Sequence, residues 1–361
     1  MRALRAEIDL QAIRHNYALA KAQLPGGRAV AVIKANAYGH GATRVAEALG
    51  QEADAFGVAC IEEAIELRQS GVVKPIWLLE GFFHNDELVL IDELRLSTAI
   101  HSDYQIEAFK RHSFKKPVDV WLKMDSGMHR LGFAPEVYAS AFAQLQGSPG
   151  IAQLGKMTHF ACADEPARGY TERQWQRFDE VCSALPGPVS ASNSPATLYW
   201  PMAHGDWLRP GLMLYGISPF APGHELGDQL KPAMRMVSEI IAVRELPAGE
   251  PVGYGGRFRT SGEVTRVGVV AMGYGDGYPR QALDGTPVIV DGVKTRLIGR
   301  VSMDMLMVDL TPVPQAGIYS EVVLWGEDSL RVEEVSGFCD AIPYELVTRL
   351  TGRAPLVYKN A

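Results

Sequence analysis

A lysine stands directly after a strongly apolar run near the start of the chain. Residues 29–33 are all Ala, Val or Ile, Lys34 follows, and a loop containing Gly39 and Gly41 comes next. Apolar surroundings at the end of a buried strand disfavour the charged form of an amino group. A neutral lysine amine is a nucleophile that forms a Schiff base with a carbonyl compound. The same residues also fit a lysine that merely reaches solvent, which is the commoner role at a strand end.

Other polar side chains lie at or just after later apolar runs. Taken singly, His159 fits a hydrogen-bonded core histidine and Arg130 a surface cation. Several such groups together predict a common site, because the carboxyl ends of parallel strands meet at one face of a barrel. The polar residues concerned are Lys123, Arg130, His159, Asn193, Ser194 and Arg209, and Gly211 lies two positions after Arg209.

Three of these residues also suggest a phosphate site. Asn193 and Ser194 follow the seventh apolar run, and Gly211 lies in the eighth. In (β/α)₈ barrels the loops after strands seven and eight often bind phosphate. The pattern therefore predicts a phosphorylated cofactor beside Lys34.

The elements that must position these groups alternate between apolar runs and helical patterns. Helical spacing covers 61–67 and 172–185, and 9–19 is a further helix with Asp9 as its N-cap. Eight strands with helices between them match a (β/α)₈ barrel of about 250 residues, although a doubly wound open sheet also alternates in this way. The strand count favours the barrel. The eight runs are 29–33, 55–59, 75–79, 96–100, 118–124, 153–160, 188–192 and 207–215.

The chain beyond residue 230 has the pattern of a second, mainly antiparallel β domain. Its β-type runs are separated by Gly and Pro turns, and Asp291-Gly292 is a hairpin signal. The Pro- and Gly-rich stretch 219–232 is the expected boundary, so we predict domains 1–230 and 231–361. The runs are 239–244, 264–272, 288–290, 306–310 and 321–324.

Composition excludes several classes of protein. Of 361 residues, 47% are hydrophobic and 21% charged, which excludes disorder, and the net charge of −7 disfavours nucleic-acid partners and anionic membranes. No apolar run approaches the ~20 residues of a membrane span. The four cysteines are far apart and the N-terminus has no apolar signal core, so we expect a cytoplasmic protein with reduced thiols and no metal site.

Seven motifs together resemble those of the bacterial alanine racemases, which depend on pyridoxal phosphate. The resemblance covers essentially the full length of the chain. It implies an N-terminal barrel followed by a C-terminal β domain, and a homodimer in which each active site is completed by the partner's C-terminal domain. The motifs are 32–41 (VIKANAYGHG), 123–132 (KMDSGMHRLG), 209–211 (RPG), 253–255 (GYG), 273–280 (GYGDGYPR), 301–304 (VSMD) and 342–344 (IPY).

The resemblance also implies which residues carry the reaction. Lys34 is the lysine linked to the cofactor and the base for D-alanine, and Tyr254 of the partner subunit is the base for L-alanine. Two bases are needed because inverting a stereocentre requires proton removal on one face and delivery on the other. His159 and Arg209 are implied to tune the tyrosine.

Further roles come from the same resemblance. Arg209 faces the pyridine nitrogen, while His159 and Asn193 lie beside the cofactor. The substrate carboxylate is held by Arg130, which matches a carboxylate bidentately, and by the backbone of Met303 of the partner subunit. Lys123 matches a lysine that is carbamylated in some members, and Tyr274 and Asp304 match entrance residues. The phosphate contacts implied are Tyr38, Ser194, Gly211, Leu212 and Tyr344.

Other functions remain as alternatives at this point. A non-catalytic pyridoxal-phosphate-binding barrel is disfavoured because the chain has residues 231–361 and Tyr254. A decarboxylase on a related fold is disfavoured by Arg209 and the Tyr254 motif. A racemase for serine or another small amino acid is a nearer alternative, since one missing methylene changes discrimination by only ~1–3 kcal/mol. A biosynthetic and a catabolic role fit the residues equally well.

Overall fold

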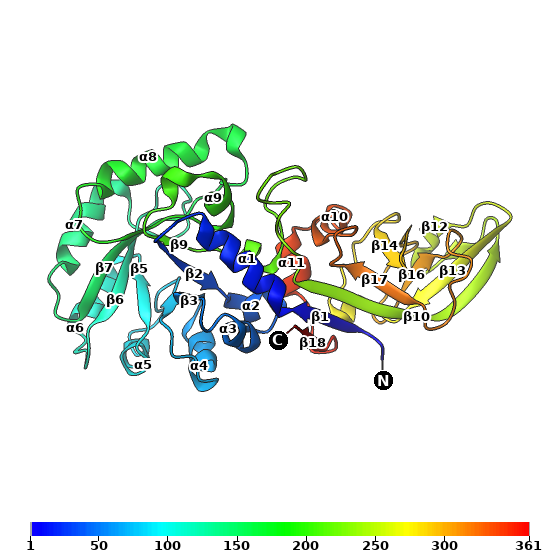
Figure 1. Ribbon diagram of the computed structural model, residues 1–361, viewed down its shortest axis with the longest axis horizontal. Helices are drawn as coiled ribbons and strands as arrows, with labels where there is room; N and C mark the ends of the chain where they lie inside the picture. Colours follow the sequence, from blue (N-terminus) through cyan, green and yellow to red (C-terminus); the bar gives the residue numbers. More distant parts are fainter. Residues whose placement is uncertain (1, 361) are drawn as a thin grey trace.

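Eight parallel strands form a barrel in the first part of the chain, seen at the left of Figure 1 in the computed structural model, which describes residues 2–360. Their order around the barrel is β8-β7-β6-β5-β4-β3-β2-β9. The backbone closes the gap between the outer two strands, because the amides of Asp206 and Arg209 donate to the carbonyls of Val189 and Ser192. The predicted barrel is thereby confirmed. The strands are β2 (Arg28–Val32), β3 (Ala55–Val58), β4 (Ile76–Leu78), β5 (Ser97–Ile100), β6 (Val118–Lys123), β7 (Ile151–Met157), β8 (Val189–Ser190) and β9 (Trp207–Leu208).

Helices between these strands surround the barrel. The predicted helices at 61–67 and 172–185 correspond to α4 and α8, and the first helix, α1, begins directly after Asp9. The Asp9 side chain accepts a hydrogen bond from the Ala12 amide at 3.0 Å, so the predicted N-cap is confirmed. The helices are α1 (Leu10–Ala22), α2 (Lys34–Gly39), α3 (Ala42–Ala48), α4 (Ile61–Gln69), α5 (Glu87–Glu93), α6 (Asp103–Arg111), α7 (Pro135–Leu145), α8 (Tyr170–Cys182) and α9 (Ser194–Tyr199).

A mainly antiparallel β domain extends away from the barrel, to the right in Figure 1. The predicted hairpin is confirmed: Asp291 and Gly292 join β14 to β15, and both have positive φ, at 46° and 80°. The β domain also contains the short helices α10 (Val332–Gly337) and α11 (Pro343–Thr348). Its strands are β10 (Met234–Pro247), β11 (Pro251–Val252), β12 (Phe258–Arg259), β13 (Val264–Val270), β14 (Pro287–Val290), β15 (Val293–Arg296), β16 (Leu306–Asp309), β17 (Glu321–Trp325) and β18 (Leu356–Lys359).

The first strand of the chain, β1 (Arg5–Asp9), belongs to the sheet of the β domain and not to the barrel. It pairs antiparallel with β10 and parallel with β18, so both ends of the chain meet in this sheet. The domain boundary predicted from the sequence assigns residues 1–230, including this strand, to the barrel domain. The paired residues are more than 200 positions apart in the chain. The sequence of a five-residue strand does not indicate which distant strand it pairs with.

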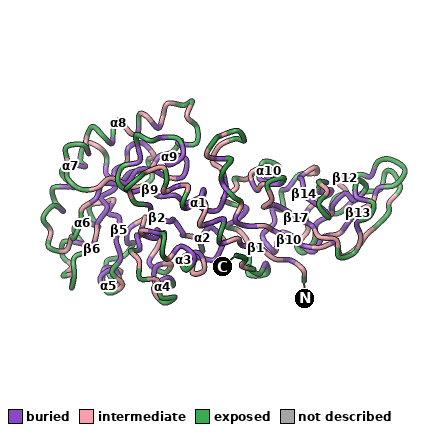
Figure 2. The backbone as a smooth tube through the Cα atoms, in the orientation of Figure 1, coloured by how far each residue is buried: buried purple, intermediate pink, exposed green. Residues whose placement is uncertain are grey.

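The hydrophobic core is continuous between the two parts of the molecule. Figure 2 shows buried segments running through the barrel and on into the β domain, and one cluster of buried side chains includes Tyr215 of the barrel and Trp325 of β17. Inside the barrel, Trp77, Trp121 and Trp207 pack together, and the Trp77 ring centroid lies 4.1 Å from that of Trp121 and 4.9 Å from that of Trp207. The barrel is therefore a filled core, and groups that bind small molecules are confined to its ends. Among residues 2–360, no helix combines the length and apolarity that crossing a membrane requires.

Candidate active site

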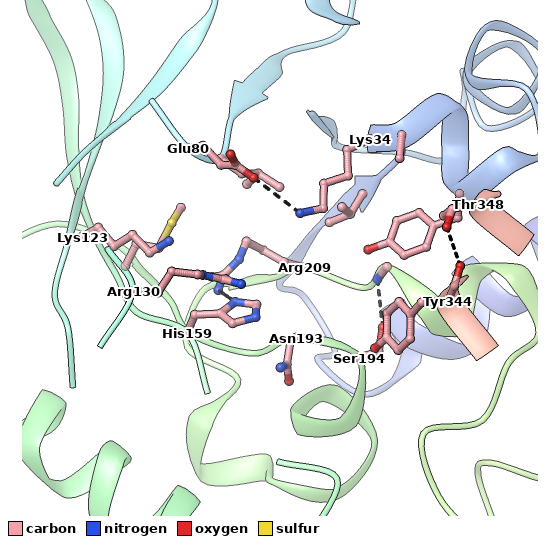
Figure 3. Close-up of a pocket in the computed structure, with 16 residues that line it drawn as sticks. Lys34, Glu80, Lys123, Arg130, His159, Asn193, Ser194, Arg209, Tyr344 and Thr348 are labelled. Atoms are coloured by element: carbon pink, nitrogen blue, oxygen red, sulfur yellow. Dashed lines mark hydrogen bonds and ion pairs between the residues drawn. The ribbon is translucent and has the colours of Figure 1, made fainter. Parts of the chain in front are cut away.

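A cavity of about 360 Å³ opens at the carboxyl ends of the barrel strands. The structure brings ten of the predicted site residues together in its wall, and Figure 3 shows most of them around one space. Leu212 lines the larger groove, about 1340 Å³, that adjoins the cavity and shares Arg130 and Tyr344 with it. The ten residues are Lys34, Tyr38, Lys123, Arg130, His159, Asn193, Ser194, Arg209, Gly211 and Tyr344.

Four predicted site residues lie elsewhere, in the β domain of the same chain. Tyr254 and Met303 are outside the cavity wall and are 71% and 52% exposed. Tyr274 is half-buried, and Asp304 is exposed. One chain by itself therefore does not place these four residues at the cavity.

The two loops that carry Tyr274 and Met303 are fastened to each other. The Gly275 amide donates to the Met303 carbonyl at 2.9 Å. The fully buried carboxylate of Asp276 accepts from Arg2 and pairs with Arg353, and Arg353 also binds Asp304 at 2.6 Å. A buried carboxylate between two guanidinium groups fixes both loops relative to the N-terminus of the chain.

Lys34 is followed by one turn of left-handed helix. Ala35 to Tyr38 all have φ between 51° and 53°, and none is glycine. Each such residue costs about 1–2 kcal/mol relative to a right-handed conformation. The turn is retained because neighbouring groups hold it: the Asn36 side chain accepts from the Ala42 amide, and the His40 ring lies 2.9 Å from the Tyr38 carbonyl.

The turn also approaches helix α11 closely. Gly39 has φ 81°, and a Cβ there would lie 2.1 Å from the Val347 carbonyl of α11. Only glycine allows this contact. As a consequence α11 brings Tyr344 and Thr348 to the cavity that Lys34 and Tyr38 line.

Arg209 is buried at the centre of the site, directly after β9. Its guanidinium donates to Ser190 Oγ at 2.7 Å, to the Thr158 carbonyl at 2.6 Å and to His159 Nδ1 at 3.4 Å. A guanidinium only donates, so Nδ1 of His159 is the acceptor and the ring proton lies on Nε2. Burial and the neighbouring Arg209 charge hold the pKa of His159 well below its usual range, which keeps the imidazole neutral. Burial lowers the pKa of Arg209 to about 10, so it remains charged at neutral pH.

The opposite side of the cavity is suited to a phosphate monoester. The Ser194 hydroxyl accepts from the amides of Gly211 and Met213 at 2.9 and 3.2 Å, which leaves its own proton free to donate. A Cβ on Gly211 would lie 2.7 Å from the Tyr38 hydroxyl, so that hydroxyl lies close to the backbone there. Hydroxyls and backbone N–H groups that converge on one space are typical of an anion site.

The remainder of the cavity is rich in positive charge. Its wall contains four cationic residues, Lys34, Lys123, Arg130 and Arg209, and one carboxylate, Glu80. Burial, with the charges of Arg209 and Arg130, lowers the pKa of Lys123 to about 8. The cavity can therefore hold a small dianionic group at one end and a carboxylate at the other, beside an amine.

Glu80 and Thr348 are cavity residues that our sequence reasoning missed. Glu80 Oε1 lies 3.7 Å from Lys34 Nζ (Figure 3). A signal for Glu80 existed, because it follows the apolar run 75–79 as Lys34 follows 29–33. Thr348 had none, since its place depends on how α11 packs against the Lys34 turn. Among the described residues, no group of three or more His, Cys, Asp or Glu side chains is arranged to hold a metal ion.

The fold and site define a class of enzyme. It has a (β/α)₈ barrel with a lysine, Lys34, at the carboxyl ends of the strands, an anion cradle formed by Ser194, Tyr38 and the backbone at Gly211, and a second β domain. Residues 8–219 match the family model "Alanine racemase, N-terminal domain", and residues 233–358 match "Alanine racemase, C-terminal domain". The chain therefore belongs to the alanine racemase family of isomerases, which confirms the resemblance seen in its motifs.

Individual relatives agree with this family over the whole chain. The alanine racemase of Chromohalobacter salexigens is 54% identical, covering 100% of this chain and 99% of that protein. The protein named "Alanine racemase, catabolic" of Pseudomonas aeruginosa is 53% identical and covers 100% of both chains. The crystal structure of the biosynthetic alanine racemase from Pseudomonas aeruginosa is 48% identical, covers 100% of both chains and superposes with a TM-score of 0.96.

Proposed function

We propose that this protein interconverts L-alanine and D-alanine with pyridoxal phosphate as cofactor. The observation that carries the proposal is the juxtaposition of Lys34 with the Ser194–Gly211 anion cradle and Arg209 in one cavity. The names of the relatives supply the substrate. The equilibrium constant between enantiomers is unity, so one site of this kind suits either role, the supply of D-alanine for the cell wall or the catabolism of alanine.

The residues present fit the cofactor. Ser194, Tyr38, Tyr344 and the backbone at Gly211 and Leu212 would hold the phosphate, and the Lys34 amine would hold the aldehyde carbon. When bound, pyridoxal phosphate withdraws electrons and so acidifies the Cα–H bond of an attached amino acid. Every other part of the reaction is assigned to residues of the protein.

Two bases, on opposite faces of the substrate Cα, transfer the Cα proton. Lys34 removes or returns the Cα proton on the D-alanine face, and Tyr254 of the partner subunit does so on the L-alanine face. A phenol ordinarily keeps its proton at neutral pH. The Nε2–H of His159, fixed by the contact of Nδ1 with Arg209, is a donor available to stabilise the tyrosine oxygen once it has lost its proton.

Arg209 is assigned a further role at the ring nitrogen, beside Asn193. Its Nε makes no hydrogen bond among residues 2–360 and remains available on the cavity side. Arginine donates a hydrogen bond but scarcely gives up a proton. With Arg209 at its nitrogen, the pyridine ring would accept electrons less strongly than with an aspartate there. A weaker electron acceptor disfavours protonation at a carbon of the cofactor in place of the substrate Cα.

Arg130 is assigned to the substrate carboxylate, together with the backbone of Met303 of the partner subunit. The bidentate geometry of the guanidinium fixes the carboxylate and with it the direction of the Cα–H bond. Lys123, carrying a carbamate, would be the anion that orients Arg130. Tyr274 and Asp304 of the partner subunit would line the entrance.

We propose a homodimer with shared sites as the active unit, in the cytoplasm and without nucleic acid or membrane as a partner. Residues 1–230, together with Tyr344 of α11, would bind the cofactor. The rest of residues 231–361 would complete the partner's site through Tyr254 and Met303. Support comes from Tyr254 and Met303, which are large, exposed and outside the cavity wall of their own chain. The groove beside the cavity offers space for them.

The first test follows the circular dichroism of L-alanine incubated with the protein and pyridoxal phosphate. We expect the signal to decay to zero with the wild type. Lys34→Ala and Tyr254→Phe should each slow the decay by at least about a hundredfold, the size of a lost acid–base catalyst. A stable signal with the wild type in the presence of bound cofactor would contradict the proposed reaction.

A further inference from the structure

The left-handed turn behind Lys34 begins at a hydrogen bond that comes from another helix. The Ala35 amide, immediately after Lys34, donates to Glu63 Oε1 at 2.7 Å. The other oxygen of the same carboxylate, Oε2, accepts from the Ala59 amide at 2.8 Å. Ala59 follows β3, so one side chain ties together the carboxyl ends of β2 and β3.

The first of these contacts is not explained by the helix to which Glu63 belongs. Glu63 is the third residue of α4, and a glutamate there commonly reaches back to a backbone amide before the helix. Oε2 does this at Ala59. Oε1 instead binds a peptide that lies 28 positions earlier in the chain and precedes the strained turn.

The turn that Glu63 holds determines the direction of two cavity residues. Lys34 stands at its start and Tyr38 at its end, and both line the cavity. Four successive non-glycine residues with positive φ do not keep this conformation unless their surroundings impose it. Other contacts act further along, at Asn36 and His40. Glu63 acts at the peptide next to Lys34.

We propose that Glu63 is a positioning residue, which orients Lys34 and Tyr38 toward the cofactor by clamping the first peptide of the left-handed turn. This proposal rests on the proposed function, because it takes Lys34 and Tyr38 as the residues that hold pyridoxal phosphate. Glu63 does not line the cavity and touches neither reacting group. Its effect is exerted through Ala35.

The chain provides a matched control on the same helix. Glu62 precedes Glu63, carries the same charge in the first turn of α4, and is exposed. Glu62→Gln and Glu63→Gln therefore change net charge and helix-end electrostatics equally. They differ in the contacts of the carboxylate: the Glu63 oxygens accept from the amides of Ala35 and Ala59, whereas Glu62 pairs with Cys60 in its own turn. The amide NH₂ of glutamine cannot accept from a backbone N–H, so only Glu63→Gln loses an acceptor for one of these two amides.

The experiment compares these variants as full-length protein, loaded with pyridoxal phosphate. We expect amide hydrogen exchange across residues 35–41 to accelerate by about tenfold in Glu63→Gln, the size of one lost hydrogen bond to a charged group. The dissociation constant for pyridoxal phosphate should rise, and kcat should fall with little change in the KM for alanine. Glu62→Gln should match the wild type in all three measurements, which are amide exchange, cofactor affinity and steady-state kinetics.

A second variant covers the case in which Glu63→Gln does not fold. Glu63→Asp keeps the charge but shortens the side chain by one methylene, so it should show the same changes to a smaller extent. Equal hydrogen exchange and cofactor affinity in Glu63 and Glu62 variants would overturn the proposal, even if the wild type racemises alanine. If the wild type proves inactive on alanine while the exchange and affinity changes appear, the positioning role stands and the proposed reaction fails.

Discussion

Lys123 is the most unusual single residue of the site, because it is buried beside two guanidinium groups. Its pKa is lowered to about 8, by burial first and by Arg209 and Arg130 second. About one molecule in ten then carries the neutral amine at pH 7, and the neutral share rises as the pH is raised through 8. A neutral amine adds to carbon dioxide and releases a proton, which turns a cation into a carbamate anion. That change would remove a repulsive charge and give Arg130 an acceptor.

We therefore predict that Lys123 takes up carbon dioxide. Protein equilibrated with isotope-labelled bicarbonate at about pH 8 should show a carbamate carbon resonance by NMR. Acidification should remove it, because the protonated amine does not react. Lys123→Met has similar length and no amine, so it should lack the resonance and show a KM for alanine raised by about tenfold, the size of one charge-assisted hydrogen bond. A resonance that persists in Lys123→Met would show that the carbamate lies elsewhere.

At the scale of elements, the cofactor cradle depends on how closely two loops approach. Gly211 precedes the 3₁₀ turn Leu212–Tyr215, and its φ of −123° lies outside the left-handed region that favours glycine. What requires glycine there is the Tyr38 hydroxyl, 2.7 Å from the place of a Cβ. Tyr38 has little freedom to move, because its ring packs against Tyr215 at 4.8 Å and Tyr344 at 6.0 Å.

Gly211→Ala should consequently weaken the binding of pyridoxal phosphate. Overpacking of this kind costs about 1–3 kcal/mol, which corresponds to a rise of roughly fivefold to a hundredfold in the dissociation constant. Gly337→Ala in α10 is the matched control, because a Cβ there meets no atom within 4 Å. Fluorescence titration with the cofactor measures both. Equal affinity in the two variants would mean that Tyr38 yields to the added methyl group.

The elements that could be predicted from the sequence are those with a local signal. Most barrel strands are predominantly apolar runs, Asp9 is a recognisable cap, and Asp291-Gly292 is a recognisable hairpin turn. The left-handed turn at 35–38 had no signal, because none of its residues is glycine and it is maintained by groups such as Glu63. Strands β1 and β18 were missed because their pairing is non-local. At the site, Lys34 and its companions stood at strand ends, whereas Thr348 arrives through the packing of α11.

At the scale of the whole molecule, the barrel forms most of the cavity wall of its own chain, whereas most of the β domain does not contribute to it. The barrel and α11 build the wall, and a continuous core holds the β domain against the barrel. Tyr254 and Met303 nevertheless lie outside that wall and are exposed. An elongated protomer of this kind can supply its far domain to a second copy, and a two-fold dimer then contains two equal shared sites.

Mixing two inactive variants tests this arrangement most directly. Lys34→Ala protein and Tyr254→Phe protein are combined in equal amounts, allowed to exchange subunits, and assayed for decay of the circular dichroism of L-alanine. Random pairing makes about half of the dimers mixed. One site of each mixed dimer combines an intact Lys34 with an intact Tyr254, and the other site lacks both, so activity should recover to about one quarter of the wild type. If Lys34 and Tyr254 acted within one chain, no pairing would restore a site. A mixture that exchanges subunits and stays inactive would contradict the account.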